Sequence, residues 1–245
     1  MGRTIVVGDI HGCALEFDDL LRSLGFAQGV DRVVLVGDLV ARGPDSAGVV
    51  ELARSCGAWA VRGNHDEKVL SWWRHAQEHG KRSADRKVKL SERHRAVAQA
   101  LTERQFGFLA ALPLMISLPE HEMLVVHAGV DPSKAPSACD EETLLTVRSI
   151  DDDGKASRKL TGTPWAQRWK GPAQIVFGHD ARRNLQLEDF ATGLDTGCCY
   201  GRQLTALVLS EAEVIPRDRT ARTKLLRQVA ARQVWCPMGS GDGPE

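Results

Sequence analysis

The stretch Gly37-Asp38-Leu39-Val40-Ala41-Arg42-Gly43-Pro44 organises the rest of the chain. It follows the apolar run Val33 to Val36, so we expect a loop at the carboxyl end of a β-strand. A carboxylate at a strand end, with glycine allowing close approach of the backbone, is suited to bridge two metal ions. Arg42 offers a guanidinium for a phosphate held by those ions. An isolated match of this kind is a weak signal, because most such strand exits are ordinary surface loops.

Four further polar clusters have the same placement, each directly after a short apolar run. The runs are Thr4–Val7, Ala58–Val61, Met123–Val126 and Gln174–Phe177, and the clusters after them are Gly8-Asp9-Ile10-His11-Gly12, Arg62-Gly63-Asn64-His65-Asp66, His127-Ala128-Gly129 and Gly178-His179-Asp180. In chain order, the first three clusters begin at Gly8, Gly37 and Arg62. Helical spacing over Cys13–Leu24 and Ser46–Ser55 separates them, and they recur at about the length of a βαβ unit. Three parallel strands are therefore expected to bring these residues to one sheet edge, where open α/β sheets bind ligands.

The strand exits supply a set of residues with the chemistry of metal ligands. The set holds two carboxylates, three imidazoles and one amide: Asp9, His11, Asp38, Asn64, His127 and His179. Taken singly, each histidine is more often an ordinary hydrogen-bonded side chain than a ligand. Together they predict a centre for two divalent metal ions that share Asp38. Mixed imidazole and carboxylate ligands favour manganese, iron, cobalt, nickel or zinc over magnesium.

Composition limits the class of protein. The chain has 245 residues, enough for one large α/β domain or a domain with a small insertion. Its 32 basic and 32 acidic side chains cancel, so no overall field attracts it to nucleic acid or membrane. No signal-peptide core or apolar run of membrane-spanning length is present, which predicts a cytosolic protein. The six cysteines form no C-x-x-C pair and are expected to be reduced thiols rather than zinc ligands.

The middle of the chain, residues 67–112, is predicted to be a helical insertion over the site. Seven Lys or Arg and two acids lie between Lys81 and Arg95. This charge run is either a solvated helix face or a basic lid that holds a polyphosphate.

The remainder is expected to be mainly β-structure with one short helix. The additional strands are predicted at 114–118, 185–190, 193–195 and 203–209, and the helix at 140–148. Arg217–Val234 is predicted to be a basic surface helix, and Gly239–Glu245 is expected to be disordered. The predicted organisation is thus a domain over residues 1–215 and a basic C-terminal helix and tail over residues 216–245.

The five clusters, in this order, resemble the signature of the calcineurin-like metallophosphoesterases, a match that runs from Gly8 to about Leu209. More narrowly, they are similar to the bacterial branch of phosphoprotein phosphatases that includes the symmetrical diadenosine tetraphosphatases. Two details support the narrower resemblance. Position 41 is alanine where protein serine/threonine phosphatases usually carry an aspartate that pairs with the catalytic histidine. The sequence Leu-Asp-Thr-Gly-Cys-Cys at 194–199 is similar to that of the tetraphosphatases.

The resemblance implies a four-layer α/β/β/α sandwich in which two mixed sheets meet at the metal site. It places Asp9, His11 and Asp38 on the first metal, and Asp38, Asn64, His127 and His179 on the second. It further implies that a water or hydroxide bridging the two ions attacks phosphorus in line, while Arg42 stabilises charge on the phosphoryl oxygens.

His65 is the predicted general acid, with the alternative that it only packs against the site. Because position 41 is alanine, the group that orients its imidazole is open, and Asp66 or a backbone carbonyl is the candidate. Arg62 is a second candidate phosphate contact or a buried structural ion pair. The candidate lid residues that bind substrate are Lys81, Arg82 and Arg86.

The expected activity is hydrolysis of diadenosine tetraphosphate, or a similar dinucleoside polyphosphate, into two nucleoside diphosphates. A serine/threonine phosphoprotein phosphatase or broad phosphomonoesterase is the first alternative. Hydrolysis of RNA caps is a related possibility. A non-catalytic nucleotide-binding or metal-sensing module is the alternative from a different class, although none of the six ligands is missing.

Overall fold

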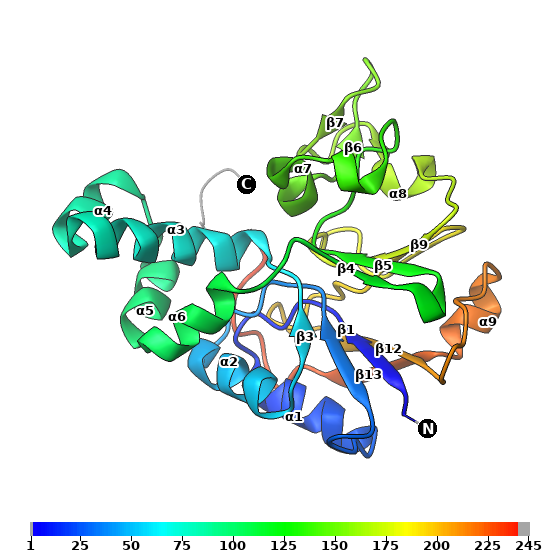
Figure 1. Ribbon diagram of the computed structural model, residues 1–245, viewed down its shortest axis with the longest axis horizontal. Coiled ribbons are helices and arrows are strands. Elements are labelled where there is room, and N and C mark those ends of the chain that lie inside the picture. Colours follow the sequence, from blue (N-terminus) through cyan, green and yellow to red (C-terminus); the bar gives the residue numbers. More distant parts are fainter. Residues whose placement is uncertain (1, 240–245) are drawn as a thin grey trace.

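Two five-stranded sheets form the centre of the computed structural model, which describes residues 2–239 (Figure 1). The first sheet has the strand order β13 (Leu226–Ala230), β12 (Gln203–Leu209), β1 (Thr4–Val7), β2 (Arg32–Leu35), β3 (Trp59–Ala60). The second has the order β10 (Gln186–Glu188), β11 (Ala191–Gly193), β9 (Gln174–Phe177), β5 (Met123–Val126), β4 (Met115–Leu118). A small third sheet joins β7 (Ala156–Ser157), β6 (Ser149–Ile150) and β8 (Thr163–Pro164).

Both large sheets are mixed, as expected. Strands β1, β2 and β3 are parallel to one another, and β12 is antiparallel to β1. In the second sheet β5, β9 and β11 are parallel, with antiparallel β4 and β10 at its edges. The carboxyl ends of the parallel strands consequently present their exit loops in the same region of the molecule.

The apolar strands are buried on both faces, which explains their continuous hydrophobic sequence. In β1, Ile5 and Val7 pack in the core against the helices, whereas Val6 between them packs in the core between the two sheets. In the second sheet Val125 shares that middle core, and its neighbour Val126 faces a third core on the outer side. The result is the predicted four-layer α/β/β/α arrangement, visible in Figure 1.

Helices cover the outer face of each sheet. The first sheet carries α1 (Ala14–Ser23) and α2 (Ser46–Ser55), followed by the inserted helices α3 (Asn64–His79), α4 (Lys81–Lys87), α5 (Glu92–Ala100) and α6 (Glu103–Ala110). On the side of the second sheet lie α7 (Glu141–Thr146) and α8 (Trp165–Arg168), with α9 (Arg219–Thr223) near one edge; two 3-10 turns cover Pro119–His121 and Pro136–Ala138. The insertion packs on the first helical layer, since Phe106 of α6 and Val49 of α2 belong to one hydrophobic core.

The prediction for the C-terminal region is wrong. Instead of one helix over Arg217–Val234, the chain forms the short helix α9 and then strand β13, which pairs antiparallel with β12. The predicted boundary at residue 215 therefore does not separate a structural unit, because β13 completes the first sheet. Most of the expected tail, residues 240–245, lies outside the described residues. Within residues 2–239 the helices are all too short or too polar to cross a membrane.

Candidate metal centre and its neighbours

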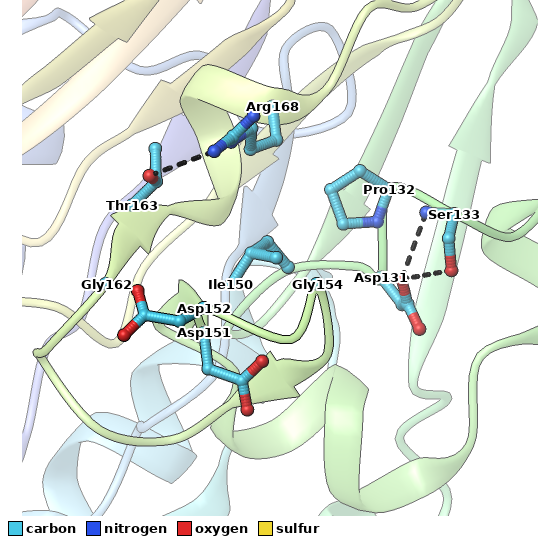
Figure 2. A pocket seen from close by; sticks show the side chains of 10 residues that line it. All are labelled: Asp131, Pro132, Ser133, Ile150, Asp151, Asp152, Gly154, Gly162, Thr163 and Arg168. Atoms are coloured by element: carbon cyan, nitrogen blue, oxygen red, sulfur yellow. Dashed lines mark hydrogen bonds between the residues drawn. The ribbon is translucent and has the colours of Figure 1, made fainter.

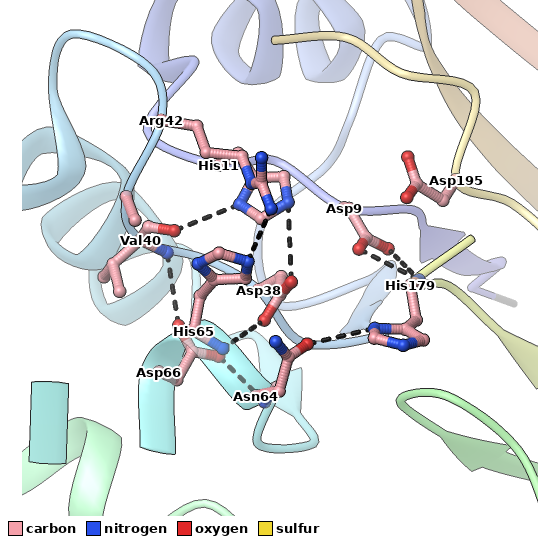
Figure 3. Close-up of polar contacts among 12 residues, drawn as sticks. Asp9, His11, Asp38, Val40, Arg42, Asn64, His65, Asp66, His179 and Asp195 are labelled. Atoms are coloured by element: carbon pink, nitrogen blue, oxygen red, sulfur yellow. Dashed lines mark hydrogen bonds and ion pairs between the residues drawn. The ribbon is translucent and has the colours of Figure 1, made fainter. Parts of the chain in front are cut away.

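All six predicted metal ligands lie together where the two sheets meet. Figure 3 labels five of them, and the sixth, His127, contacts Asp38 and Asn64. The loop after β1 supplies Asp9 and His11, the loop after β2 supplies Asp38, and the first residue of α3 is Asn64. The remaining two, His127 and His179, follow β5 and β9 of the second sheet. Asn64 is half-buried and the other five are buried.

Asp38 occupies the centre of this group and faces imidazoles on two sides. Its Oδ2 atom lies 3.4 Å from Nε2 of His11, and its Oδ1 atom lies 3.5 Å from Nε2 of His127. Two sets of three potential ligand atoms, each within 4.8 Å of one another, share this carboxylate: His11 with Asp38 and His65, and Asp38 with His127 and His179. The arrangement fits the predicted bridging role of Asp38.

The hydrogen bonds on the far side of two imidazoles fix where their lone pairs point. Nδ1 of His11 lies 3.1 Å from the carbonyl oxygen of Val40, and Nδ1 of His127 lies 2.9 Å from that of Val36. Because a carbonyl only accepts, Nδ1 donates in both cases, and in the neutral imidazole Nε2 keeps its lone pair. A backbone carbonyl behind the imidazole is the usual support of a metal-ligating histidine.

Several acceptors consequently converge without a proton between them. Nε2 of His127 lies 2.9 Å from Oδ1 of Asn64 and also faces Asp38, so each of these atoms offers a lone pair. Nε2 of His179 is buried, and none of the described residues 2–239 offers it a hydrogen-bond partner. Buried acceptors that face one another are costly unless a cation lies among them. The residues present therefore fit a divalent metal site.

The backbone takes an uncommon conformation at three of the predicted metal ligands. His11, Asp38 and His179 adopt the left-handed region at φ 49°, 50° and 70°, where non-glycine residues are uncommon. Two glycines permit the close packing. A Cβ atom on Gly63 would lie 2.2 Å from Oδ1 of Asp38, and one on Gly178 would lie 1.8 Å from Oδ1 of Asp9.

Burial and charge repulsion shift the titration of these groups. Burial raises the pKa of Asp9 well above its usual value, and the nearby Asp195 and Asp38 raise it further. Burial also lowers the pKa of His11 and His179 well below the usual value, which favours neutral imidazoles. A bound cation would stabilise neutral imidazoles and would offset the repulsion between the ionised carboxylates.

Asp9 differs in placement from the other predicted ligands. Its carboxylate accepts hydrogen bonds from the backbone N–H of His179 at 3.0 and 3.2 Å, and it belongs to neither set of three. Beyond it lies Asp195, a buried carboxylate whose pKa burial raises to about 6 (Figure 3). The strand-exit argument did not select Asp195 as a site residue, although the stretch containing it marked the narrower resemblance.

His65 belongs to the first set of three, and Arg42 lies beside it. Nη2 of Arg42 is 2.9 Å from Nε2 of His65, and the His65 ring stands edge-on to that of His11 at 5.0 Å between centroids. The other ring nitrogen of His65, Nδ1, lies 2.8 Å from Nε2 of His94, a residue of α5. His94 was not predicted as a site residue, because it belongs to the insertion and follows no strand.

Comparison with known proteins agrees with this geometry. Residues 2–203 match the calcineurin-like phosphoesterase family. The chain belongs to this family. It is 32% identical to the asymmetrical bis(5'-nucleosyl)-tetraphosphatase PrpE of a Geobacillus species over 86% of this chain and 91% of that protein. It is 35% identical to the symmetrical bis(5'-nucleosyl)-tetraphosphatase of Shewanella baltica over 89% of this chain and 98% of that protein.

Structural comparison gives the same family. A crystal structure provisionally assigned as a diadenosine tetraphosphatase superimposes with a TM-score of 0.76 at 37% identity, covering 94% of both chains. As a calcineurin-like phosphoesterase, the protein is a hydrolytic enzyme, and the family implies divalent metal ions.

Asp66 does not orient His65 in this calcineurin-like phosphoesterase. Its Oδ1 accepts the backbone N–H groups of Leu39 and Val40 at 3.0 and 3.2 Å, and its Oδ2 accepts that of Gly63 at 2.9 Å. The side chain thereby ties the loop after β2 to the N-terminus of α3. Asp66 supports the phosphoesterase site through the backbone, and its predicted contact with His65 is replaced by His94.

The residues in and near the insertion that were predicted to contact phosphate have other surroundings. Arg62 donates to Oε2 of Glu67 at 2.6 Å and to the carbonyl of Leu112 at 3.2 Å, which corresponds to the structural alternative. Lys81, Arg82 and Arg86 are exposed on α4. Helix α4 follows the C-terminal end of α3, whereas the site lies at the N-terminus of α3 (Figure 1). Helix α4 packs back along the far half of α3, where Trp72 donates to Asp85 at 3.0 Å, about 12 Å along the helix from Asn64, so this placement does not favour a basic lid.

One hollow of the phosphoesterase lies apart from the predicted metal ligands. Its volume is about 510 Å³, and it is lined by loops around the small third sheet (Figure 2). Asp131, Asp151, Asp152 and Arg168 are its charged lining residues, and none of the ten residues that line it is a predicted site residue.

Proposed function

We propose that this calcineurin-like phosphoesterase hydrolyses dinucleoside tetraphosphates, with diadenosine tetraphosphate cleaved symmetrically into two molecules of ADP. The observation that carries the reaction class is the convergence of acceptors around Asp38 beside the His65–Arg42 pair. The substrate class is supported by relatives named as bis(5'-nucleosyl)-tetraphosphatases. They include both symmetrical and asymmetrical enzymes, so the position of cleavage has to be tested directly.

Two divalent ions, with manganese as our first choice, would be held by the strand-exit residues. His11 and Asp38 would hold one ion with Asp9, and Asp38 would share the other with Asn64, His127 and His179. When bound, such ions polarise the phosphoryl group and lower the pKa of water so that it is a nucleophile near neutral pH.

Arg42 would bind the phosphoryl group under attack. Its guanidinium donates to His65 in this structure. A phosphate oxygen of a bound substrate would be a stronger acceptor for the same guanidinium, because it is charged. Transfer of Arg42 from the imidazole to phosphate leaves Nε2 of His65 available to carry a proton. Substrate binding would thereby prepare the general acid.

The hydrolysis then needs one proton at the leaving group. The oxygen of water forms a bond to phosphorus, and the bond from phosphorus to the bridging oxygen breaks. The electron pair of that bond stays with the departing nucleoside diphosphate, and Nε2 of His65 protonates its terminal oxygen. The proton lost by water balances the one that His65 delivers.

Product analysis tests this proposal. The purified enzyme, loaded with manganese, is incubated with diadenosine tetraphosphate and, separately, with a phosphoserine peptide, and the nucleotides are separated by chromatography. ADP as the sole product is expected. ATP together with AMP would replace symmetrical by asymmetrical cleavage. Release of phosphate from the peptide without nucleotide turnover would make a protein phosphatase the better assignment.

A further inference from the structure

Three consecutive hydrogen bonds connect the insertion to the catalytic centre. Oγ of Ser91 lies 2.6 Å from Nδ1 of His94, Nε2 of His94 lies 2.8 Å from Nδ1 of His65, and Nε2 of His65 lies 2.9 Å from Nη2 of Arg42. Ser91 is also the N-cap of α5, where its hydroxyl accepts the backbone N–H of His94. The chain of contacts is thus anchored at the start of a helix.

Arg42 determines which atom donates and which accepts in each of these three hydrogen bonds. A guanidinium only donates, so Nε2 of His65 accepts, and its Nδ1 carries the proton in the neutral imidazole. Nδ1 of His65 then donates to Nε2 of His94, whose own Nδ1 donates to the hydroxyl of Ser91. One arrangement of donors and acceptors therefore satisfies both imidazoles.

The geometry of the two rings supports a well-formed hydrogen bond. The ring planes of His65 and His94 differ by 5°, with centroids 4.9 Å apart, so the bond lies close to the plane of both imidazoles. His94 is fully buried and His65 is 4% exposed, so water competes little for this contact. Ala41, in the loop after β2, has no group that could make the same contact.

We propose that His94 is the positioning residue of His65, and that Ser91 supports this arrangement by accepting a hydrogen bond from Nδ1 of His94. His94 holds the imidazole of His65 so that Nδ1 points into the insertion and Nε2 points to the catalytic centre. The helical insertion consequently contributes to catalysis through His94, rather than through the lysines and arginines of α4. This inference rests on the proposed role of His65 as general acid.

The test compares two aryl phosphates that differ in their need for an acid. Phenolate is a poor leaving group that needs protonation, whereas 4-nitrophenolate leaves with little assistance. For His94→Ala in the manganese-loaded enzyme, we expect kcat on phenyl phosphate to fall about 10–100-fold, the usual effect of losing a residue that orients a catalytic group. The fall on 4-nitrophenyl phosphate is expected to be much smaller, and KM is expected to change little.

Two further variants and a matched control isolate the hydrogen bond. His94→Gln places an amide oxygen near the former Nε2 position and is expected to restore most of the activity on phenyl phosphate. Ser91→Ala is expected to cause a smaller loss than His94→Ala. His75→Gln is the control, because His75 of α3 contacts Ser83 at 3.0 Å within the same insertion. It is expected to behave as the unaltered enzyme.

The activities of these variants on the two aryl phosphates test the positioning role of His94. Equal losses on both substrates, or a loss that His94→Gln does not reverse, would overturn the positioning role. Aryl phosphates test it even if diadenosine tetraphosphate is not cleaved, so failure of the proposed substrate is distinguishable. If His94→Ala does not fold, nitrogen-15 NMR of the unaltered protein decides. A proton on Nδ1 of His65 supports the inference, and a proton on Nε2 of the free enzyme contradicts it.

Discussion

Oδ1 of Asp38 lies 3.5 Å from Nε2 of His127, and the second oxygen of the same carboxylate faces His11. One side chain thus connects the exit loop of the first sheet with that of the second. Since each oxygen faces a different imidazole, Asp38 has the placement of a shared ligand.

Asp38→Asn is expected to lower bound manganese and to reduce hydrolysis at least about 100-fold, since loss of even an outer partner of a metal site costs 10–100-fold. Metal content by mass spectrometry and kcat are measured on the same preparation. Asp18→Asn, on the outer helix α1, is the control and should change neither. Full metal content in Asp38→Asn would contradict the bridging role.

Arg42→Lys is expected to keep the metals and to lower kcat/KM about 10–100-fold, because an ammonium cannot reproduce the forked contacts of a guanidinium. Lysine also cannot reach His65 in the same geometry as the present 2.9 Å contact. Metal analysis and steady-state kinetics separate the two effects. Unchanged kinetics would remove Arg42 from the proposed phosphate site.

Asp66→Ala is expected to destabilise the fold, because the backbone N–H groups of Leu39, Val40 and Gly63 lose their acceptor. Each buried donor left unpaired costs about 1–3 kcal/mol, so we expect a loss of about 3 kcal/mol or more in the free energy of unfolding. Urea denaturation measures it. Asp66→Asn keeps an acceptor oxygen and should lose less, whereas equal stability of all three proteins would argue against the structural role.

Acid should weaken the fold through Asp31. Hydrogen bonds from Arg3 lower the pKa of this carboxyl to about 2, so its contribution to stability is present above the unfolded pKa near 4 and is lost as the pH falls through about 2. The contribution is about 1 kcal/mol, because Arg3 is partly in solvent. Asp31→Asn should flatten the dependence of unfolding free energy on pH between 4 and 2, and an unchanged slope would exclude the pair as its source.

Replacement of Lys81, Arg82 and Arg86 together by alanine is expected to leave KM for diadenosine tetraphosphate within about twofold. These side chains are exposed on α4, at the end of α3 remote from the metal ligands. The comparison uses phenyl phosphate as the short substrate. A rise in KM confined to the tetraphosphate would restore the basic lid.

The local sequence determined the parts of the fold whose signals are local. Strands β1, β5, β9 and β12 and helix α2 begin and end where the periodicity predicts. The apolar runs of the strands are buried on both faces. Polar residues are excluded from such strands and therefore lie in the loops that follow them. The C-terminal strand β13 was missed, because its sequence Leu-Arg-Gln-Val-Ala does not alternate apolar and polar residues. Its pairing with β12 holds it at the edge of the sheet.

The same division holds for the site. Sequence order by itself indicated the six metal-ligand candidates, His65 and Arg42, because each follows or lies near a strand end and parallel strands share an edge. Only the tertiary structure decided the partner of His65. His94 is 29 residues from His65 and on another helix, so packing of α5 against α3, rather than any local pattern, brings the two imidazoles within 2.8 Å.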